Sequence, residues 1–418
     1  MTDITWQVTV GGTVVPAFRA EATGSTYGSV GSAHITTSIA ALDANGIDLY
    51  ALTSGSGQTE VDISVAVGSG AVTRIFGGEY LTTSWDMDAD TAVLHARSWA
   101  GALADQKRIL TKIGSAVSGA LTPLAPGQVS AAGISNLNQT VGMIVSAIAN
   151  EYGFTPVLNL SGANNPTIGT LYGSDDQAFM PVPQSLWSIL NQLARDTGYV
   201  VYDTPTKQLV FGTPGAGLPT LAPSYKVPAQ GAAFPVRALK FTHQPRQNGT
   251  FRVLVIAYDP AKAQVAIGRA SYIGANFAGQ NGLTAGLATG TSAVTADAAL
   301  AKINANGSTT VPLYTFHFDG LSQAQADTQA GAIANDIAKR EVIASFECDG
   351  LPGIEQSQMA QFSGQIPSGF GGTTFYASGF SHTIVQPKAK QRDAQAGFLT
   401  RVKMLNVPSE ALAAETAG

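Results

Sequence analysis

The sequence is poor in charge. Asp, Glu, Lys and Arg make up only 12% of its 418 residues, about half of the ~25% that is typical of soluble domains. A free monomer needs a charged surface to stay soluble, so this composition favours a subunit that covers much of itself with partners. Lys and Arg number 23 against 28 Asp and Glu, a net charge of −5. This balance argues against a broad phosphate-binding surface, which needs clustered cations.

Cysteine is almost absent. Cys348 stands alone, which excludes a disulfide framework and a thiolate metal site. The start, MTDITWQVTVGG, lacks the basic residues and apolar run of a signal peptide, and no run of ~18 apolar residues occurs anywhere. We therefore expect neither a signal peptide nor a membrane-spanning segment.

Glycine and hydrophobic residues are plentiful. The 46 Gly, the 20 Pro and a hydrophobic share of 44% predict many turns, much β structure and two to four compact units. ITWQVTVGGTVVP alternates and turns at Gly11-Gly12, and SWDMDADTAVLHARSW has the pattern of a hairpin. Residues 1–105 are therefore predicted to form a first antiparallel barrel or sandwich.

Residues 106–230 have a different pattern. Apolar residues recur at helical spacing in TVGMIVSAIANEYG, with Thr140 or Asn138 as N-cap, and again in SLWSILNQLARDTGY, with Ser185 at its start and Gly198 at its end. Two short strands around Asp-Thr-Pro-Thr-Lys follow the second helix. We expect a helix–hairpin docking domain.

The rest of the chain returns mostly to strands. Residues 231–273 and 311–406 are predicted to form a second barrel, with an Ala-rich helix that starts near Asp319 or Ser322. Residues 274–310 are small, rich in Gly and Ala, and are interpreted as a loop or small insertion, and 407–418 as a flexible tail. The fold class is thus mainly β with an α+β insertion: two antiparallel barrels and a helix–hairpin domain.

No group of residues stands out as a catalytic or metal site. The five histidines are scattered, without the i, i+4 pairing of a zinc helix: His34, His95, His243, His317 and His382. Asp86, Asp88 and Asp90 lack the Gly and Glu of a calcium loop and are interpreted as turn formers. We predict no catalytic, cofactor or metal residue.

Two carboxylate pairs and one basic run leave alternatives open. The sequence does not exclude Glu79 with Asp86, or Glu341 with Glu347, as the acids of a glycan hydrolase, although nothing singles them out. The nearest to a basic run is KAKQR, Lys388 to Arg392, which is interpreted as a solvated hairpin tip.

Several segments resemble, in order, contractile-tail phage baseplate hub proteins of the T-even hub-like and late-control gene D families. The resemblance extends to the amino-terminal half of type VI secretion spike proteins. It rests on order and spacing in most of residues 60–406: QSLWSILNQLARDTGYVVYDTPTKQLVFG, FRVLVIAYDPAKAQVAIGRA, AQADTQAGAIANDIAKREVIASFECDGLPGIEQSQMAQFSG and GFSHTIVQPKAKQRDAQAGFLTRVKML. The 274–310 segment is longer than this family leads us to expect, and no spike or lysozyme-like extension follows residue 406.

The resemblance implies a homotrimer whose six tube-like barrels form a pseudo-sixfold ring. It implies a hexameric tail tube above, a trimeric central spike below, wedge proteins around, and a lumen for DNA. The protein would belong to the virion and assemble in the host cytoplasm. Two hypotheses follow. A lumen with few cations would not hold passing DNA, and edge strands, TEVDISVAV or strands of the last barrel, would pair around the ring.

Three alternatives remain at this stage. One is a tail-associated glycan or peptidoglycan hydrolase. Another is a receptor-binding or carbohydrate-binding β protein, which is disfavoured because all four tryptophans fall inside strand or helix patterns typical of a core: Trp6, Trp85, Trp99 and Trp187. The third is the hub of a tailocin or secretion machine.

Overall fold

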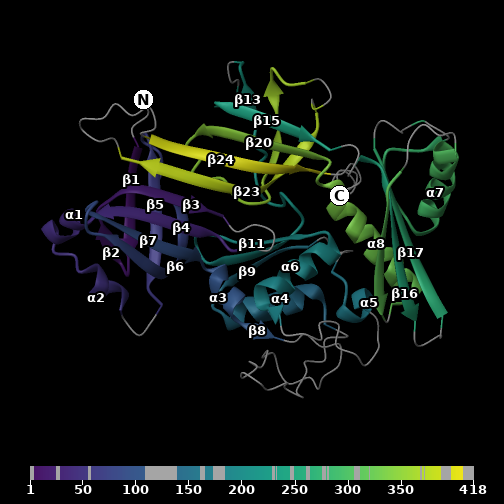
Figure 1. The fold of residues 1–418 in the computed structure, drawn as a ribbon, viewed down its shortest axis with the longest axis horizontal. Coiled ribbons are helices and arrows are strands. Elements are labelled where there is room, and N and C mark those ends of the chain that lie inside the picture. Colours follow the sequence, from purple (N-terminus) through teal and green to yellow (C-terminus); the bar gives the residue numbers. More distant parts are fainter. Residues whose placement is uncertain are drawn as a thin grey trace.

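A computed structural model describes most of the chain. The described residues are 4–24, 29–54, 58–108, 139–160, 165–172, 184–227, 231, 233–244, 249–259, 264–274, 279, 282–305, 311–319, 321–367, 370, 372–386 and 397–407. They form five sheets, the largest with 12 strands, together with helices (Figure 1). The architecture is mainly β with several antiparallel sheets, as predicted. The KAKQR run and the tail beyond residue 407 lie outside the described residues.

The first unit is antiparallel, as the alternation predicts. Its elements are β1 (Ile4–Val10), β2 (Thr13–Val15), β3 (Ala17–Thr23), β4 (Ser32–Ser38), α1 (Ile39–Ala44), α2 (Leu49–Thr53), β5 (Glu60–Val67), β6 (Thr73–Asp86) and β7 (Thr91–Ser98). Gly11 and Gly12, both at positive φ, close the β1–β2 hairpin. The strands surround one core, to which Val10, Ile35 and Leu94 belong. Both predicted hairpins, β1–β2 and β6–β7, are confirmed.

The second unit contains the predicted helices and hairpin. Its elements are α3 (Ala100–Asp105), β8 (Lys107–Arg108), α4 (Val141–Glu151), β9 (Thr155–Asn159), α5 (Ile168–Tyr172), β10 (Gln184–Ser185), α6 (Leu186–Thr197), β11 (Val200–Asp203) and β12 (Gln208–Gly212). Thr140 caps α4; Ser185 caps α6, which ends at Gly198 with φ 76°. The apolar stripes of α4 and α6 share one core with Leu209 and Phe211 of the hairpin.

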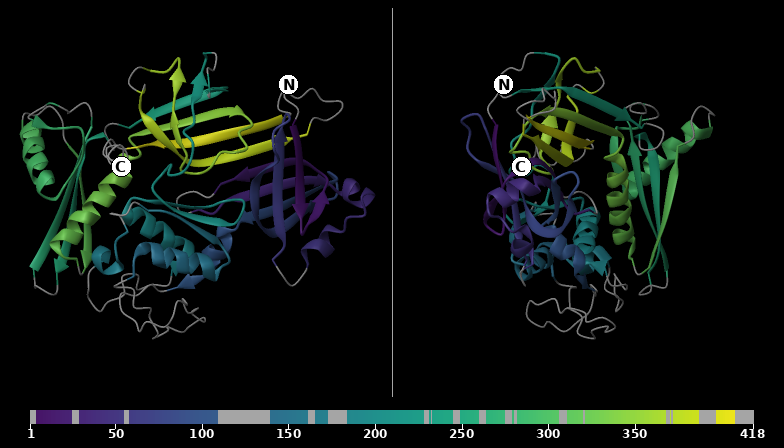
Figure 2. Two further views of the ribbon diagram at one scale, coloured as in Figure 1. Left: turned by 180° about the vertical axis from the view of Figure 1, so that it is seen from behind. Right: turned by 60° about the vertical axis from the view of Figure 1, so that its left-hand side comes forward.

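The hairpin β11–β12 is buried on both faces. Val200, Tyr202 and Val210 pack against Tyr376 and Leu405 of the last unit, on the side opposite to the helices. The unit therefore connects the long sheet to the helices, which lie on one side of that sheet in every view (Figures 1 and 2).

The third unit continues the sheet of the first. Its strands are β13 (Pro223–Tyr225), β14 (Phe234–Val236), β15 (Ala238–His243), β20 (Val342–Asp349), β21 (Met359–Gln361), β22 (Ser363–Gly364), β23 (Thr374–Val385) and β24 (Gly397–Asn406). The order is β15-β20-β24-β23-β3-β4-β7-β6-β5-β1-β2, with β21 beside β23. β23 pairs antiparallel with β3, from Ser381 opposite Thr23 to Val385 opposite Arg19. The two predicted tube-like units thus share a single sheet.

The expectation that TEVDISVAV is an edge strand is wrong. Its residues form β5, which pairs with β1 on one side and with β6 on the other. The ends of the long sheet are β15 and β2 instead. An alternating pattern reports a half-buried strand but not its place in the sheet.

The fourth unit corrects two further expectations. Its elements are β16 (Phe251–Asp259), β17 (Gln264–Ile273), β18 (Gly286–Thr289), α7 (Gly290–Ala305), β19 (Leu313–Asp319) and α8 (Gln323–Ala338). These strands form a separate sheet, β18-β17-β16-β19, not part of a second barrel. The segment 274–310 is not simply a loop, because it contains β18 and α7. Ser322 is the N-cap of α8, whose Ala-rich face covers one side of the sheet.

Candidate docking surfaces

One side of the long sheet is covered by the β11–β12 hairpin at Ile343 and Leu405, and beyond that contact it is lined mainly by polar residues. Residues on β15, β20, β24, β23, β3 and β4 alternate between the cores and this face. We call the outward set the polar face: Lys240, Ser345, Glu347, Arg401, Lys403, Ser381, Thr383, Arg19, Glu21, Thr23, Ser32 and Thr36. The registers of five neighbouring strand pairs place these residues next to one another on the same side of the sheet. The face is rich in hydroxyl groups and runs without a break from the third unit into the first.

Arginines on and beside this face are ion-paired. Arg401 Nε lies 2.8 Å from Glu347 Oε2 on the neighbouring strand. Arg19 pairs with Glu21 on its own strand, and Arg237, just before β15, pairs with Asp349. Exposed pairs of this kind contribute about 0–1 kcal/mol to stability. Their clearer effect is to neutralise guanidinium groups that would otherwise attract anions.

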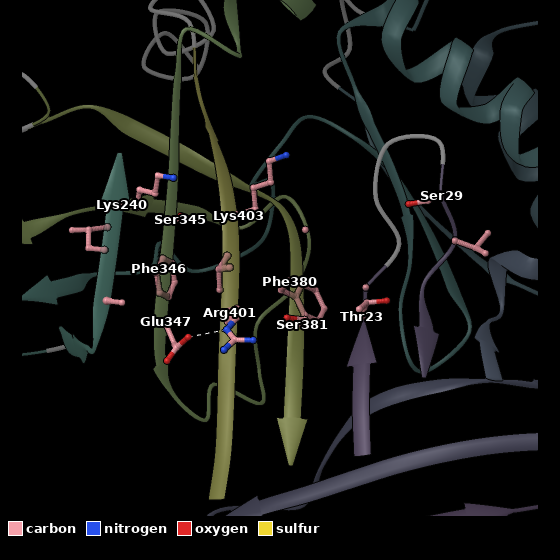
Figure 3. Close-up of a pocket in the computed structure, with 16 residues that line it drawn as sticks. Thr23, Ser29, Lys240, Ser345, Phe346, Glu347, Phe380, Ser381, Arg401 and Lys403 are labelled. Atoms are coloured by element: carbon pink, nitrogen blue, oxygen red, sulfur yellow. Dashed lines mark hydrogen bonds and ion pairs between the residues drawn. The ribbon is translucent and has the colours of Figure 1, made fainter. Parts of the chain in front are cut away.

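A shallow hollow of about 610 Å³ lies on the polar face (Figure 3). Phe346, Phe380 and Val402 are among its lining residues, and Lys240 and Lys403 carry no ion pair among the described residues. The carboxylate in its lining, Glu347, is bound to Arg401 in the figure. The hollow therefore offers cations and hydroxyl groups but not the opposed carboxylates of a glycosidase.

The structure places the five histidines in different settings. His34 and His95 face each other across β4 and β7, with ring centroids 4.7 Å apart. His243 Nε2 lies 3.6 Å from Glu341, and His317 is exposed on β19. Among the described residues no group of three or more His, Cys, Asp and Glu is placed to hold a metal ion.

His382 and Cys348 are both core residues. His382 is 1% exposed, and its Nδ1 lies 3.0 Å from the Thr400 hydroxyl. Burial lowers the pKa of His382 to about 3, so the ring is neutral at physiological pH. Burial, with smaller contributions from neighbouring charges, raises the pKa of the Cys348 thiol to about 12. Such a thiol is not a nucleophile at neutral pH.

The aspartates of the β6–β7 turn have structural roles. Asp86 accepts hydrogen bonds from the N–H groups of Asp88 and Ala89, at 3.1 and 3.0 Å. Asp90 accepts from the Ser38 hydroxyl at 2.6 Å and from the Ala40 N–H at 2.9 Å, and these bonds lower its pKa. The prediction that they form the turn is confirmed, and Asp90 also fixes the start of α1 beside the turn.

The carboxylates considered for hydrolysis bind groups of their own chain. Glu79 lies 3.4 Å from Arg97, and Glu347 is held by Arg401. Glu341 accepts a hydrogen bond from the Tyr272 hydroxyl at 3.1 Å. Burial raises the pKa of Glu341, while hydrogen bonds with Tyr272 and His243 act in the opposite direction and lower it.

One tryptophan departs from the sequence interpretation. Trp99 and Trp187 are buried and Trp6 packs on a core, but Trp85 is 45% exposed. Alternation places Trp85 opposite the buried Ala92, on the inner side of the strand. The last part of β6 lies outside the core although its partner β7 is still part of it, and no local pattern could reveal that.

Solved structures of tail proteins have a similar fold. A tail protein from Neisseria meningitidis MC58 matches with a TM-score of 0.59 and 13% identity, over 96% of each chain. The 43 kDa tail protein of prophage MuSo2 from Shewanella oneidensis matches with a TM-score of 0.54 and 14% sequence identity, over 96% of this chain and 98% of that protein. The chain has the fold of phage tail proteins.

A third solved structure has a similar fold, whereas the sequence comparisons find no match. Prophage tail protein gp18 from Listeria monocytogenes EGD-e matches with a TM-score of 0.52 and 11% identity, over 99% of this chain and 100% of that protein. No protein-family model and no curated protein matches the sequence. The tail-protein fold that the resemblance implies is confirmed by the comparison of structures. Among the described residues no helix is long and apolar enough to cross a membrane.

Proposed function

We propose that the chain is a structural subunit of a contractile phage tail baseplate. Three copies form a pseudo-sixfold ring that joins the hexameric tail tube to the trimeric central spike. The pairing of β23 with β3 supports this most strongly, because it joins strands of the first and third units in a single sheet. One chain then supplies two of the six positions that a hexameric tube requires.

The polar face is the proposed lining of the lumen. Passing DNA carries one phosphate charge per ~1.7 Å of its axis, and clustered free cations would hold it. Arg19 and Arg401 are already paired with carboxylates, and Ser345, Ser381 and Thr383 are uncharged. The cations of the face without an ion pair among the described residues are Lys240 and Lys403, which we expect to be too few to hold DNA tightly. Such a surface lets DNA pass without specific binding. Tight, salt-dependent DNA binding by the assembled ring would contradict this part of the proposal.

The open ends of the long sheet are the proposed seals between copies. β15 pairs only with β20, and β2 only with β1, among the described strands. Exposed edges accept a further strand readily. Pairing of β15 with the β2 end of the next copy would continue the sheet around the ring and leave no edge for misassociation.

The proposal assigns no enzymatic activity to the chain. The carboxylates Glu79, Glu341 and Glu347 are engaged by Arg97, Tyr272 and Arg401. Spike and wedge proteins are the proposed partners, and the subunit would belong to the virion after assembly in the host cytoplasm. Zymography against peptidoglycan provides a direct check, and clearing by the purified protein would refute this assignment.

The solution mass tests the central claim. Light scattering of the purified protein, alone and mixed with candidate tube and spike proteins, should give a trimer of the 43.0 kDa chain that binds both partners. A monomer that ignores both would overturn the proposal.

A further inference from the structure

The sheet of the fourth unit has an apolar outer face. α8 covers one side, where Phe251, Val253 and Val255 are buried. We call the opposite side the apolar face: Leu254, Ile256, Tyr258, Val265, Ile267 and Leu313. Val265 is 61% exposed, Leu313 50% and Tyr258 49%. A contiguous apolar surface of this kind marks an interaction site in a soluble protein.

α7 covers only one end of this side of the sheet. Its Asp297 accepts a hydrogen bond from Ser271 at 2.6 Å and lies 3.7 Å from Arg269. α8 lies between the sheet and the rest of the molecule, so the apolar face is turned outward at one end of the long axis (Figure 1).

An arginine and a histidine accompany the apolar face. Arg252 lies on the same side of β16, opposite Leu313 on β19, and its Nε is buried without a hydrogen-bond partner among the described residues. His317 is exposed opposite Ile256. The face thus suits a partner that combines apolar side chains with carboxylates.

The β6–β7 hairpin end has this complementary composition. Trp85 is 45% exposed and Met87 74%, and the carboxylates of Asp86 and Asp88 stand beside them in the turn. Asp90 ties the turn to the start of α1. Figure 1 shows α1 at the opposite end of the long axis from β16 and β17.

We infer that the β6–β7 hairpin end of one copy docks on the apolar face of the next copy. The contact joins two different surfaces, head to tail, and such contacts close into rings when the rotation per copy permits. The inference rests on the proposed trimer and identifies one of its interfaces. Trp85 and Met87 would bury against Ile267 and Val265, while Asp86 or Asp88 would meet Arg252.

Single substitutions on either surface test the contact. Ile267→Asp on one side, and Trp85→Ala on the other, should each raise the concentration at which the trimer half-dissociates by about tenfold or more, since a central aromatic anchor typically contributes more than 1.4 kcal/mol. Val72→Asp is the matched control, because Val72 is 73% exposed in the first unit but outside both surfaces. Circular dichroism should show that all variants remain folded.

A charge exchange adds a readout that general destabilisation cannot imitate. Asp88→Arg and Arg252→Glu should each weaken the trimer, and the double variant should recover most of the loss. Full trimers in every single variant would overturn the contact while leaving the proposed ring intact. A wild-type chain that stays monomeric with both partners would instead refute the ring and the contact together.

Cysteine cross-linking provides an independent measurement. Cys348 is buried with a raised thiol pKa, so it does not interfere. Met87→Cys combined with Ile267→Cys should give covalently closed trimers under mild oxidation, whereas either change alone should not. Absence of cross-linked species from a trimeric double variant would also overturn the contact.

Discussion

Replacing His382 with glutamine should remove a defined part of the acid sensitivity of the third unit. The imidazole lies between the rings of Phe380 and Phe398, with centroids 5.1 and 5.2 Å away. Its Nε2 is buried and has no hydrogen-bond partner among the described residues. A charge on this ring would therefore lack both water and a counter-ion.

The sign and size of the effect follow from the pKa. Burial lowers the pKa of His382 from 6.5 to about 3. Above pH 6.5 the ring is neutral in both the folded and the unfolded chain, so it adds no pH dependence to the free energy of unfolding. Below 6.5 only the unfolded chain binds the proton, so the free energy of unfolding falls by about 1.4 kcal/mol per pH unit until the folded pKa is reached. At about pH 4.5 the free energy of unfolding is therefore about 2.7 kcal/mol lower than at about pH 6.5, which corresponds to roughly a hundredfold larger equilibrium constant for opening.

Hydrogen exchange of peptides from β23 and β24 measures this opening locally. Wild type and His382→Gln are compared at the same pH, so intrinsic exchange rates cancel, and other titrating groups contribute equally to both. The wild type should lose protection relative to the variant by roughly a hundredfold between about pH 6.5 and 4.5. His34→Gln, which alters an exposed ring, is the control and should behave as wild type. Equal acid sensitivity of wild type and His382→Gln would refute the reasoning.

Three further outcomes are expected. Cys348 should not react with a thiol reagent at about pH 8 until the protein is unfolded in urea, because its thiol pKa is raised to about 12; rapid labelling of the native protein would contradict this. Gly268→Ala should destabilise the fourth unit by about 1–3 kcal/mol, since a Cβ there would meet the Ala326 carbonyl oxygen of α8 at 2.0 Å; unchanged protection of α8 in hydrogen exchange would argue otherwise. Asp203→Ala should cost about 1–3 kcal/mol, because Asp203 accepts the Ala100 N–H at 2.9 Å, and thermal melting would detect it.

Local signals carried much of the prediction. The Asp-rich turn predicted the β6–β7 hairpin because Asp86 bonds its own following N–H groups. The apolar spacing of α6 predicted a buried stripe because Leu186, Ile189 and Leu193 return to one side every turn.

The failures arose where information is not local. Among the residues of α7 whose side chains are described, those buried are Ala293, Ala296 and Leu300. Its sequence therefore lacks a strong apolar stripe, and the interpretation of residues 274–310 was a loop or small insertion. The alternation of β16 and β17 was recognised, yet alternation cannot tell which sheet a strand joins. The sequence does not reveal the docking surfaces for the same reason. Whether Trp85 or Ile267 is exposed depends on which elements from distant parts of the chain cover it.

The pairing of β23 with β3 has a consequence for synthesis on the ribosome. The core of the first unit includes Ile384 and Phe398, which are translated more than 250 residues after its seventh strand, β7 (Thr91–Ser98), is complete. Until then β3 lacks one neighbour, and an unpaired edge invites wrong association. A nascent or truncated chain cannot finish its own first domain. The first unit can therefore complete its sheet only after β23 and β24 have been synthesised.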